Sequence, residues 1–301
     1  MREVATQLFQ AGAQASPGHA RLIGVGRAAL TEVREGSAAT FALVLIASCL
    51  VVFVAASLAR GVGDTRLGRA SWVLTGIRLC ALVIGFGALA YQVRISGTIT
   101  AADQLVLNWL TEHRSAWLTG PAIAITDAGS PVGTFVLAIV IGAIASRRAH
   151  SLLPAIILVG TVGAAGVAST VTKGLVGRQR PPLITQVLLE TDHSFPSGHV
   201  TGAMALFGMT AVMLGFGLPT AQRWALGVLA GLVTVLVAAT RLYLGEHWFT
   251  DVVGGVVLGG AAVLAGSAVY VAWMSRIGVR DCGEYPVRSV VTDTTTMGTA
   301  A

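Results

Sequence analysis

The chain has 301 residues, of which 54% are hydrophobic and only 11% are charged. About a quarter of the residues in a typical soluble domain are charged, so this composition excludes an ordinary soluble protein. The net charge of +6 comes without a basic stripe interleaved with aromatic residues, so we do not expect nucleic acid as a partner. The three cysteines have no paired spacing, which argues against a disulfide framework and against a zinc site.

The N-terminal segment, residues 1–37, is polar and mixed in composition. A secretory signal would place an apolar stretch nearer the N-terminus, so we expect the chain to enter the membrane through its own helices. Residues 276–301 are again polar, and their Thr-rich end predicts a flexible C-terminal tail. The length between these ends leaves room for one membrane domain and little for a second, soluble domain.

Seven apolar stretches approach the length of about 20 residues that crosses the roughly 30 Å hydrocarbon layer of a bilayer. They lie at roughly 38–58, 72–92, 129–146, 152–172, 199–217, 225–240 and 252–274. The second stretch contains Arg78, which is unfavourable in hydrocarbon unless its side chain reaches the interface or faces the bundle. Gly and Ala are abundant in these stretches and allow close helix approach. The sequence therefore predicts an all-α integral membrane protein built as an antiparallel bundle of transmembrane helices.

Residues 95–118 differ from these stretches because leucines and Trp109 mix with Asp103, Asn108, Glu112 and Arg114. This mixture predicts a short helix that lies at the membrane interface rather than a span. Its role is open at this point, although such a helix could guide a lipid tail.

Three polar segments border the apolar stretches, namely Lys173–Pro181, Pro196–His199 and Arg241–Asp251. Alternating the spans places all three on one face of the membrane. The opposite face receives Arg60, Arg66, Arg69, Arg147, Arg148, Arg223, Arg276 and Arg280. Arginine-rich faces are usually cytoplasmic, so we expect the polar segments on the extracytoplasmic face of the cell membrane. An argument against this orientation is that seven spans also place the arginines of residues 1–37 on the outer face.

The cations of these segments suit a phosphate ester, which carries nearly two negative charges. Arginine matches two phosphate oxygens with a planar fork, whereas lysine provides a compact point charge. We expect Lys173, the only lysine of the chain, to neutralise the phosphate together with Arg180 and Arg241. Arg178 is a further candidate, and Pro181 prevents a helical continuation and so sets the direction of Arg180.

The tetrapeptide at residues 196–199, Pro-Ser-Gly-His, comes directly before an apolar stretch and predicts the first turn of a helix. The free N–H groups of a helix N-terminus bind anions, and Ser197 can cap the helix or donate directly. Gly198 allows the backbone to approach the phosphate closely. His199 would then lie beside the bound ester.

His247 and Asp251 are four residues apart at the entrance to the last apolar stretch. A carboxylate close to one imidazole nitrogen sets the tautomer and leaves the other nitrogen free to attack phosphorus. The second histidine, His199, can protonate the departing lipid alkoxide, which is otherwise a poor leaving group. Asp251 can at the same time be a helix N-cap.

The remaining polar residues have simpler interpretations. We expect topology anchors at Arg147, Arg148 and Arg223, and structural or solvated side chains at His19, His113 and His150. Asp192 and His193 lie beside the site, but we do not expect them to act directly. Glu246 is expected at most to tune its neighbour.

The three segments closely resemble the signature of the PAP2 superfamily, the type 2 phosphatidic acid phosphatases. The family pattern Lys-x6-Arg-Pro is matched at Lys173, Arg180 and Pro181, and Pro-Ser-Gly-His at residues 196–199. The third pattern, Ser-Arg-x5-His-x3-Asp, is matched at Arg241, His247 and Asp251. The one departure is Thr240 in place of serine, which keeps the hydroxyl group. The motifs cover about 170–275, and the pattern of spans extends the resemblance to 72–275.

The resemblance implies a six-helix core over 72–275, so that 38–71 is an extra N-terminal helix and loop. It implies that His247 is the nucleophile and forms a phosphohistidine, that Asp251 orients it, and that His199 is the general acid. The phosphate-binding residues implied are Lys173, Arg180, Ser197, Gly198 and Arg241. The family needs no metal and no other cofactor, which agrees with a sequence lacking a carboxylate cluster suited to Mg²⁺. Soluble vanadium haloperoxidases share the family pocket, but the membrane spans argue against that activity.

We therefore expect a membrane lipid phosphatase that acts on phosphatidic acid, phosphatidylglycerol phosphate or a polyprenyl diphosphate such as undecaprenyl diphosphate. One alternative is a transferase that passes the phosphoryl or head group to an alcohol. Another is a non-catalytic scaffold or transporter, which the complete signature disfavours. The choice of lipid depends on pocket shape, and neither that choice nor the oligomeric state follows from the sequence.

Overall fold

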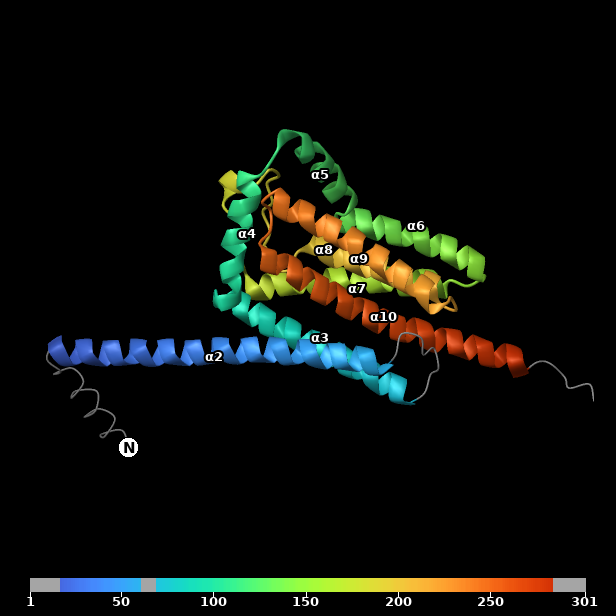
Figure 1. Cartoon of the computed structure of the whole chain (residues 1–301), viewed down its shortest axis with the longest axis horizontal. Helices are drawn as coiled ribbons and strands as arrows, with labels where there is room; N and C mark the ends of the chain where they lie inside the picture. The colour runs from blue at the N-terminus through green and yellow to red at the C-terminus, as the bar shows by residue number, and fades with distance from the viewer. Residues whose placement is uncertain (1–16, 61–68, 284–301) are drawn as a thin grey trace, which may run out of the picture.

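The computed structural model describes residues 17–60 and 69–283, and these residues form helices joined by short connections (Figure 1). The helices are α2 (Pro17–Arg60), α3 (Arg69–Arg94), α4 (Ala101–Glu112), α5 (Ala116–Ala128), α6 (Pro131–Ala149), α7 (Leu153–Val176), α8 (Gly198–Gly215), α9 (Thr220–Tyr243) and α10 (Phe249–Gly283). Two 3₁₀ turns, η1 (Thr98–Thr100) and η2 (Leu183–Thr185), lie between them. No strand occurs in the described ranges, so the predicted all-α fold is confirmed.

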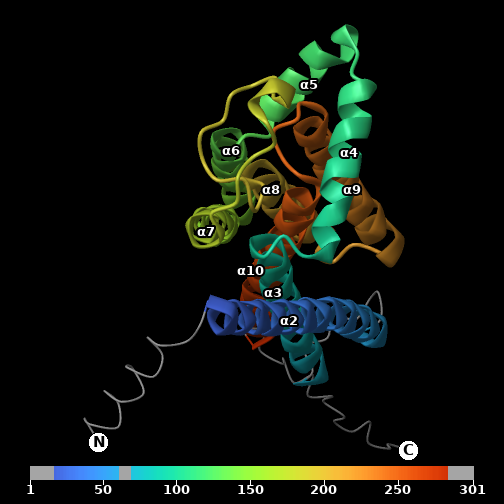
Figure 2. The same cartoon turned by 90° about the vertical axis from the view of Figure 1, so that its left-hand side faces the viewer.

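Seven of these helices are long and apolar enough to cross a membrane, as predicted. They are α2, α3 and α6 to α10, and α2 packs along α3 outside the bundle that the others form (Figures 1 and 2). The helices α2 and α10 extend past the apolar stretches, into the polar segments predicted at 1–37 and 276–301. The flexible tail was predicted at 276–301; residues 276–283 are helical in α10, and the part after Gly283 lies outside the described residues.

Two spans that the sequence analysis placed at 129–146 and 225–240 are longer in the structure. The first is α6, which begins at Pro131, where proline needs no N–H partner. The hydroxyl of Ser130 caps this helix by accepting from the N–H of Gly133 at 3.0 Å, and His150 ends it in the left-handed conformation. The second is α9, Thr220–Tyr243, which carries Arg241 inside its last turn.

The interfacial segment predicted at 95–118 contains α4, which lies across one end of the bundle (Figures 1 and 2). Leu105 and Trp109 are exposed on this helix, whereas Asp103 and Leu107 are buried against the bundle. The prediction of one short helix was incomplete, because the chain turns after α4 and forms a second helix, α5.

Glycines allow α8 and α10 to pack closely. A Cβ atom added at Gly255 would lie 2.9 Å from the carbonyl oxygen of Ser197, and one at Gly259 would lie 2.8 Å from that of Thr201. Both distances are too short for a real side chain, so only glycine permits this approach. The N-terminal parts of α8 and α10 therefore lie side by side; they carry His199 and Asp251, and His247 lies two residues before α10.

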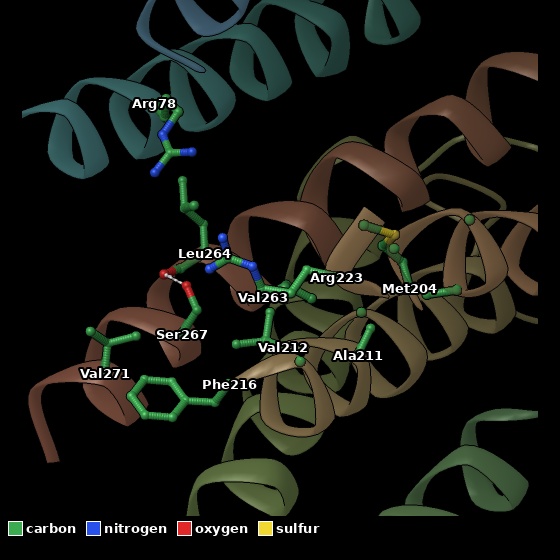
Figure 3. Close-up of a pocket in the computed structure, with 15 residues that line it drawn as sticks. Arg78, Met204, Ala211, Val212, Phe216, Arg223, Val263, Leu264, Ser267 and Val271 are labelled. Carbon is green, nitrogen blue, oxygen red and sulfur yellow. Dashed lines mark hydrogen bonds between the residues drawn. The ribbon is translucent and has the colours of Figure 1, made fainter. Parts of the chain in front are cut away.

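Arg78 on α3 faces the interior of the bundle, which is one of the two arrangements that make an intramembrane arginine tolerable. It lines a cavity of about 450 Å³ together with Arg223 of α9 and the apolar side chains of α8 and α10 (Figure 3). Its Nη2 atom lies 3.3 Å from the Thr75 hydroxyl, and its Nε atom lies 3.4 Å from the carbonyl oxygen of Leu74.

Candidate active site

The predicted site residues meet at the end of the bundle that α4 covers. Lys173 lies in the last turn of α7, Arg241 in the last turn of α9, and Asp251 in the first turn of α10. Residues 177–197 form the connection from α7 to α8 and bring Arg180 and Ser197 to the same place. Because consecutive spans run in opposite directions, these three helix ends and the start of α8 share one face.

The short connection between α9 and α10 depends on Gly245, which has a φ of +72°. A Cβ atom at this position would lie 2.2 Å from the carbonyl oxygen of Thr185, so a side chain is excluded by space as well as by backbone conformation. This turn holds Glu246 and His247 under the α7–α8 connection, where both side chains are buried.

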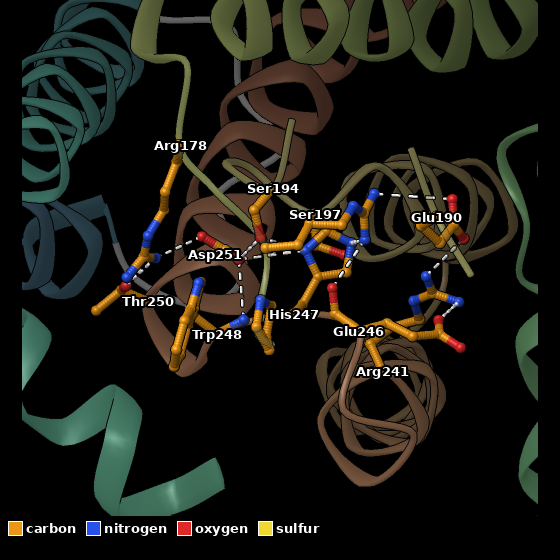
Figure 4. A network of polar contacts seen from close by, with 12 residues as sticks. Arg178, Glu190, Ser194, Ser197, Arg241, Glu246, His247, Trp248, Thr250 and Asp251 are labelled. Atoms are coloured by element: carbon orange, nitrogen blue, oxygen red, sulfur yellow. Dashed lines mark hydrogen bonds and ion pairs between the residues drawn. The ribbon is translucent and has the colours of Figure 1, made fainter. Parts of the chain in front are cut away.

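His247 is held in one tautomer by its neighbours (Figure 4). Its Nδ1 atom lies 3.3 Å from Oδ2 of Asp251, which is fully buried, so the carboxylate accepts the Nδ1 proton. Its Nε2 atom lies 3.3 Å from Nη1 of Arg180, so the ring nitrogen with the free electron pair faces the cations. Burial is the main cause that lowers the pKa of His247; Asp251 opposes it, Arg180 and Arg241 reinforce it, and the resulting pKa is about 4. The imidazole is therefore neutral near pH 7.

Asp251 is positioned by a network that the sequence analysis missed. The same Oδ2 atom accepts from the Trp248 N–H at 2.9 Å and from the Ser194 hydroxyl, and Oδ1 accepts from Nη1 of Arg178 at 2.5 Å. Asp251 is not the N-cap that the sequence predicted, because α10 begins at Phe249 and Asp251 lies in its first turn. Its carboxylate instead reaches back to the N–H of Trp248, the residue before the helix, and also serves His247 as expected.

Arg178 corrects a prediction, because it does not belong to the group of cations that faces His247. Its second nitrogen, Nη2, donates to Asp103 at 2.5 Å, and the guanidinium lies over the Trp248 ring at 5.4 Å. Asp103 also accepts from the N–H and from the hydroxyl of Thr250, both at 2.8 Å. Arg178 therefore links Asp103 on α4 to Asp251 and helps to hold the Asp251 carboxylate in position.

The three predicted phosphate-binding cations, Lys173, Arg180 and Arg241, are paired with carboxylates. Asp192 pairs with both Lys173 and Arg180, and Arg180 also donates from Nε to the Asp192 carbonyl oxygen at 2.9 Å. Burial raises the pKa of Asp192, but the hydrogen bonds from Lys173 and Arg180 outweigh this effect and lower the pKa to about 2. Asp192, which was not expected to take part, thus occupies two of the predicted phosphate-binding residues.

Arg241 has a similar arrangement and is almost fully buried. It pairs with Glu246 and with Glu190, the latter at 2.9 Å, and it donates to the Thr126 hydroxyl of α5 at 2.9 Å. Burial raises the pKa of Glu246, and Glu190 adds to the increase while Arg241 opposes it. Three cations thus face three carboxylates, which leaves the group close to neutral in the absence of a bound anion.

The first turn of α8 is arranged to accept an anion. Ser197 is the N-cap residue by position, but its side chain does not cap the helix, contrary to one of the two predicted roles. Its hydroxyl is buried and has no hydrogen-bond partner among the residues that the structure describes. His199 is the second residue of α8 and lies within electrostatic range of His247 and Arg241. The Ser197 hydroxyl and the free N–H groups of this turn can therefore donate to a bound anion.

Asp103, Ser194 and Glu190 were missed by the sequence analysis for a common reason. None of them lies in a motif, and each reaches the site from a loop or from the interfacial helix. The one available signal was Asp103, an acidic residue among the apolar positions of an otherwise amphipathic helix. Within the described ranges, no group of three or more His, Cys, Asp or Glu side chains is arranged to hold a metal ion.

Comparisons with known proteins agree with this geometry. Residues 154–275 match the PAP2 superfamily. Phosphatidylglycerophosphatase B of Bacillus subtilis is 30% identical over 168 residues, which cover 54% of this chain and 81% of that protein. The undecaprenyl-diphosphatase of Sulfolobus acidocaldarius is 31% identical over 104 residues, or 33% of this chain and 39% of that protein. The crystal structure of a transmembrane PAP2 type phosphatidylglycerolphosphate phosphatase from Bacillus subtilis superposes with a TM-score of 0.58 and 27% identity, over 64% of this chain and 94% of that one.

Proposed function

Because this chain belongs to the PAP2 superfamily, we propose that it removes a phosphate group from a membrane lipid through a covalent phosphohistidine, without a metal ion. The observation that carries the proposal is the setting of His247. This histidine is buried and neutral, its Nδ1–H is directed to Asp251, and its Nε2 atom faces the cations. A neutral imidazole with one nitrogen committed to a carboxylate is a competent nucleophile at the other nitrogen.

In the first step, Nε2 of His247 attacks phosphorus, a nitrogen–phosphorus bond forms, and the bond to the lipid oxygen breaks. His199 gives its proton to that oxygen, so the lipid leaves as an alcohol. In the second step, a water molecule attacks the phosphohistidine, and His199 takes a proton from that water. The nitrogen–phosphorus bond breaks, inorganic phosphate is released, and both histidines return to their starting states.

The cations stabilise the phosphoryl oxygens in both steps. Lys173, Arg180 and Arg241 supply positive charge, while the Ser197 hydroxyl and the N–H groups at Gly198 donate hydrogen bonds. An incoming phosphate takes the place of the Asp192 carboxylate, because this side chain is 53% exposed and can turn outward. These ion pairs thus avoid leaving the buried Arg241 and the partly buried Lys173 and Arg180 unpaired.

The substrate class follows from the membrane setting and from the relatives. The site lies at the ends of helices that are long enough to span a bilayer, so a phosphate carried by a lipid reaches it directly. The names of the relatives favour phosphatidylglycerol phosphate and a polyprenyl diphosphate, and phosphatidic acid offers the same phosphate monoester. Arg147, Arg148 and Arg223 lie at the opposite end of the bundle, which favours an extracytoplasmic site in the cell membrane.

Phosphate release by the purified protein in detergent, with EDTA present, tests the proposal. The substrates are phosphatidic acid, phosphatidylglycerol phosphate and a polyprenyl diphosphate, and the variants are His247→Ala and His199→Ala. We expect at least a thousandfold loss in the first variant, since it removes the nitrogen that forms the covalent intermediate. His150→Asn is the matched control, because it removes an exposed histidine at the far end of the bundle and asparagine tolerates its left-handed conformation.

Acid quenching during turnover should trap phosphate on the wild-type protein and not on His247→Ala. Turnover that persists in His247→Ala would refute the nucleophile. Activity that disappears in EDTA and returns with a divalent cation would refute the metal-independent mechanism.

A further inference from the structure

The hydroxyl of Ser169 on α7 behaves differently from every other hydroxyl of that helix. Thr161, Thr170 and Thr172 each donate to the carbonyl oxygen four residues earlier, at distances of 2.7 to 3.1 Å. This is the usual way in which a helix satisfies a hydroxyl group away from water. Ser169 makes no such bond, is only 2% exposed, and has no hydrogen-bond partner in the part of the chain that the structure describes.

Ser169 lines a cavity that borders the candidate active site. It precedes Lys173 by one helical turn, so both side chains leave the same face of α7, about 6 Å apart along its axis. Both line a cavity of about 440 Å³ that also contacts Asp192 and Gly198. A Cβ atom added at Gly198 would lie 3.9 Å from the Ser169 hydroxyl oxygen, so this hydroxyl lies across from the first turn of α8.

The same cavity continues into an apolar groove of about 690 Å³ between α6 and α7. The two share Pro131, Gly166, Thr170 and Gly198, and the groove is otherwise lined mainly by apolar side chains. Ser169 therefore lies where the polar cavity meets the groove, one turn deeper in the bilayer than Lys173. A lipid whose phosphate reaches Lys173 and whose chain follows the groove must pass its linking atoms beside Ser169.

We propose that Ser169 is a substrate-binding residue whose hydroxyl donates to an oxygen of the lipid on the chain side of the scissile phosphate. In a glycerol lipid this acceptor is an ester or ether oxygen of the glycerol unit, and in a polyprenyl diphosphate it is an oxygen of the inner phosphate. A buried hydroxyl without a partner is unfavourable, and a bound lipid oxygen provides the missing acceptor. The proposal rests on the proposed function, and it adds a contact that selects lipids over simple phosphate esters.

Ser169→Ala tests this contact, with Thr172→Ala as the matched control from the same helix, where the hydroxyl is already bonded to the backbone. Steady-state hydrolysis is compared for phosphatidylglycerol phosphate, a polyprenyl diphosphate and p-nitrophenyl phosphate. On the side of the bridging oxygen away from the scissile phosphate, p-nitrophenyl phosphate has only an aromatic ring and no neighbouring ester, ether or phosphate oxygen. We expect KM for the lipid substrates to rise about five- to tenfold with kcat little changed, and both constants for p-nitrophenyl phosphate to stay the same. A rise with only one of the two lipids identifies which acceptor the hydroxyl binds.

A second measurement separates this proposal from the proposed function. The equilibrium affinity for phosphatidylglycerol phosphate and for the polyprenyl diphosphate is measured in detergent on His247→Ala, with and without Ser169→Ala. We expect about the same five- to tenfold weakening for at least one lipid, whether or not the wild-type protein hydrolyses it. If Ser169→Ala changes the affinity for neither lipid, the role of Ser169 is overturned even if hydrolysis is established.

A purely structural role gives a different pattern. Removing a hydroxyl that holds α7 in place would lower the thermal stability and would impair p-nitrophenyl phosphate and lipids alike. We expect the thermal stability of Ser169→Ala to equal or exceed that of the wild type, because alanine removes an unsatisfied polar group. A destabilised variant with uniform loss on all substrates refutes the proposal.

Discussion

Asp103, a residue outside every motif, pairs with Arg178, which in turn pairs with Asp251. This chain of contacts leads to a prediction about Asp103. Asp103 is 3% exposed and accepts three hydrogen bonds, from Arg178, from the Thr250 N–H and from the Thr250 hydroxyl. Asp103→Asn keeps the size and one acceptor oxygen, but it removes the charge and points an NH₂ group at a partner that donates. Arg178 then retains Asp251 as its one carboxylate within the described residues.

The expected loss of stability follows from the burial of this pair. Breaking a buried ion pair by removing one partner typically lowers the free energy of unfolding by about 3 to 5 kcal/mol. Because the amide oxygen can still accept from Thr250, we expect Asp103→Asn to lie at the lower end, about 3 kcal/mol. We also expect kcat to fall about tenfold, which corresponds to about 1.4 kcal/mol in the barrier, with KM nearly unchanged. Asp103 pairs with Arg178 and not with the phosphate-binding cations Lys173, Arg180 and Arg241, so substrate binding should be spared.

Thermal unfolding in detergent and steady-state kinetics on one lipid phosphate measure both effects. Glu112→Gln is the control, since it neutralises an exposed acid on the same helix. A double-mutant cycle with Arg178→Gln should show that the two losses are not additive, because the second substitution removes a partner that is already lost. Wild-type stability and kcat in Asp103→Asn would refute the idea that α4 supports the nucleophile. Additive losses would show that Asp103 and Arg178 act separately.

Two further predictions concern charge. Asp192→Asn removes the carboxylate that competes for Lys173 and Arg180, so inorganic phosphate should inhibit at about two- to fivefold lower concentration, and unchanged or weaker inhibition would contradict this competition. The pKa of His247 is about 4 in the folded protein and about 6.5 when unfolded, so the unfolded state binds more protons between these values. The free energy of unfolding should therefore fall as the pH is lowered from 6.5 to 4, by at most about 3 kcal/mol. His247→Gln should make the free energy of unfolding less dependent on pH in this range. An unchanged dependence would show that another group titrates there.

The sequence alone determined the membrane architecture. The length and apolar character of each stretch set the number of spans, because a helix needs a fixed length to cross hydrocarbon. Lys173, Arg241 and Asp251 mark span ends, since a charged side chain is unfavourable within the hydrocarbon layer. Alternating spans then require these ends to share a face, so the convergence of the site could be inferred without a structure.

Only the tertiary structure decided which charge meets which. Arg178 and Arg180 are two residues apart in the same segment, yet one turns toward Asp103 and the other toward His247. Asp103 and Arg178 are 75 positions apart in the chain, and hydrophobic periodicity does not predict such a pair. Contacts of this kind depend on the close approach of whole helices and on the direction of single side chains. Composition and spacing therefore predict where the cations gather, and three-dimensional packing determines that Asp192 and Glu246 occupy them.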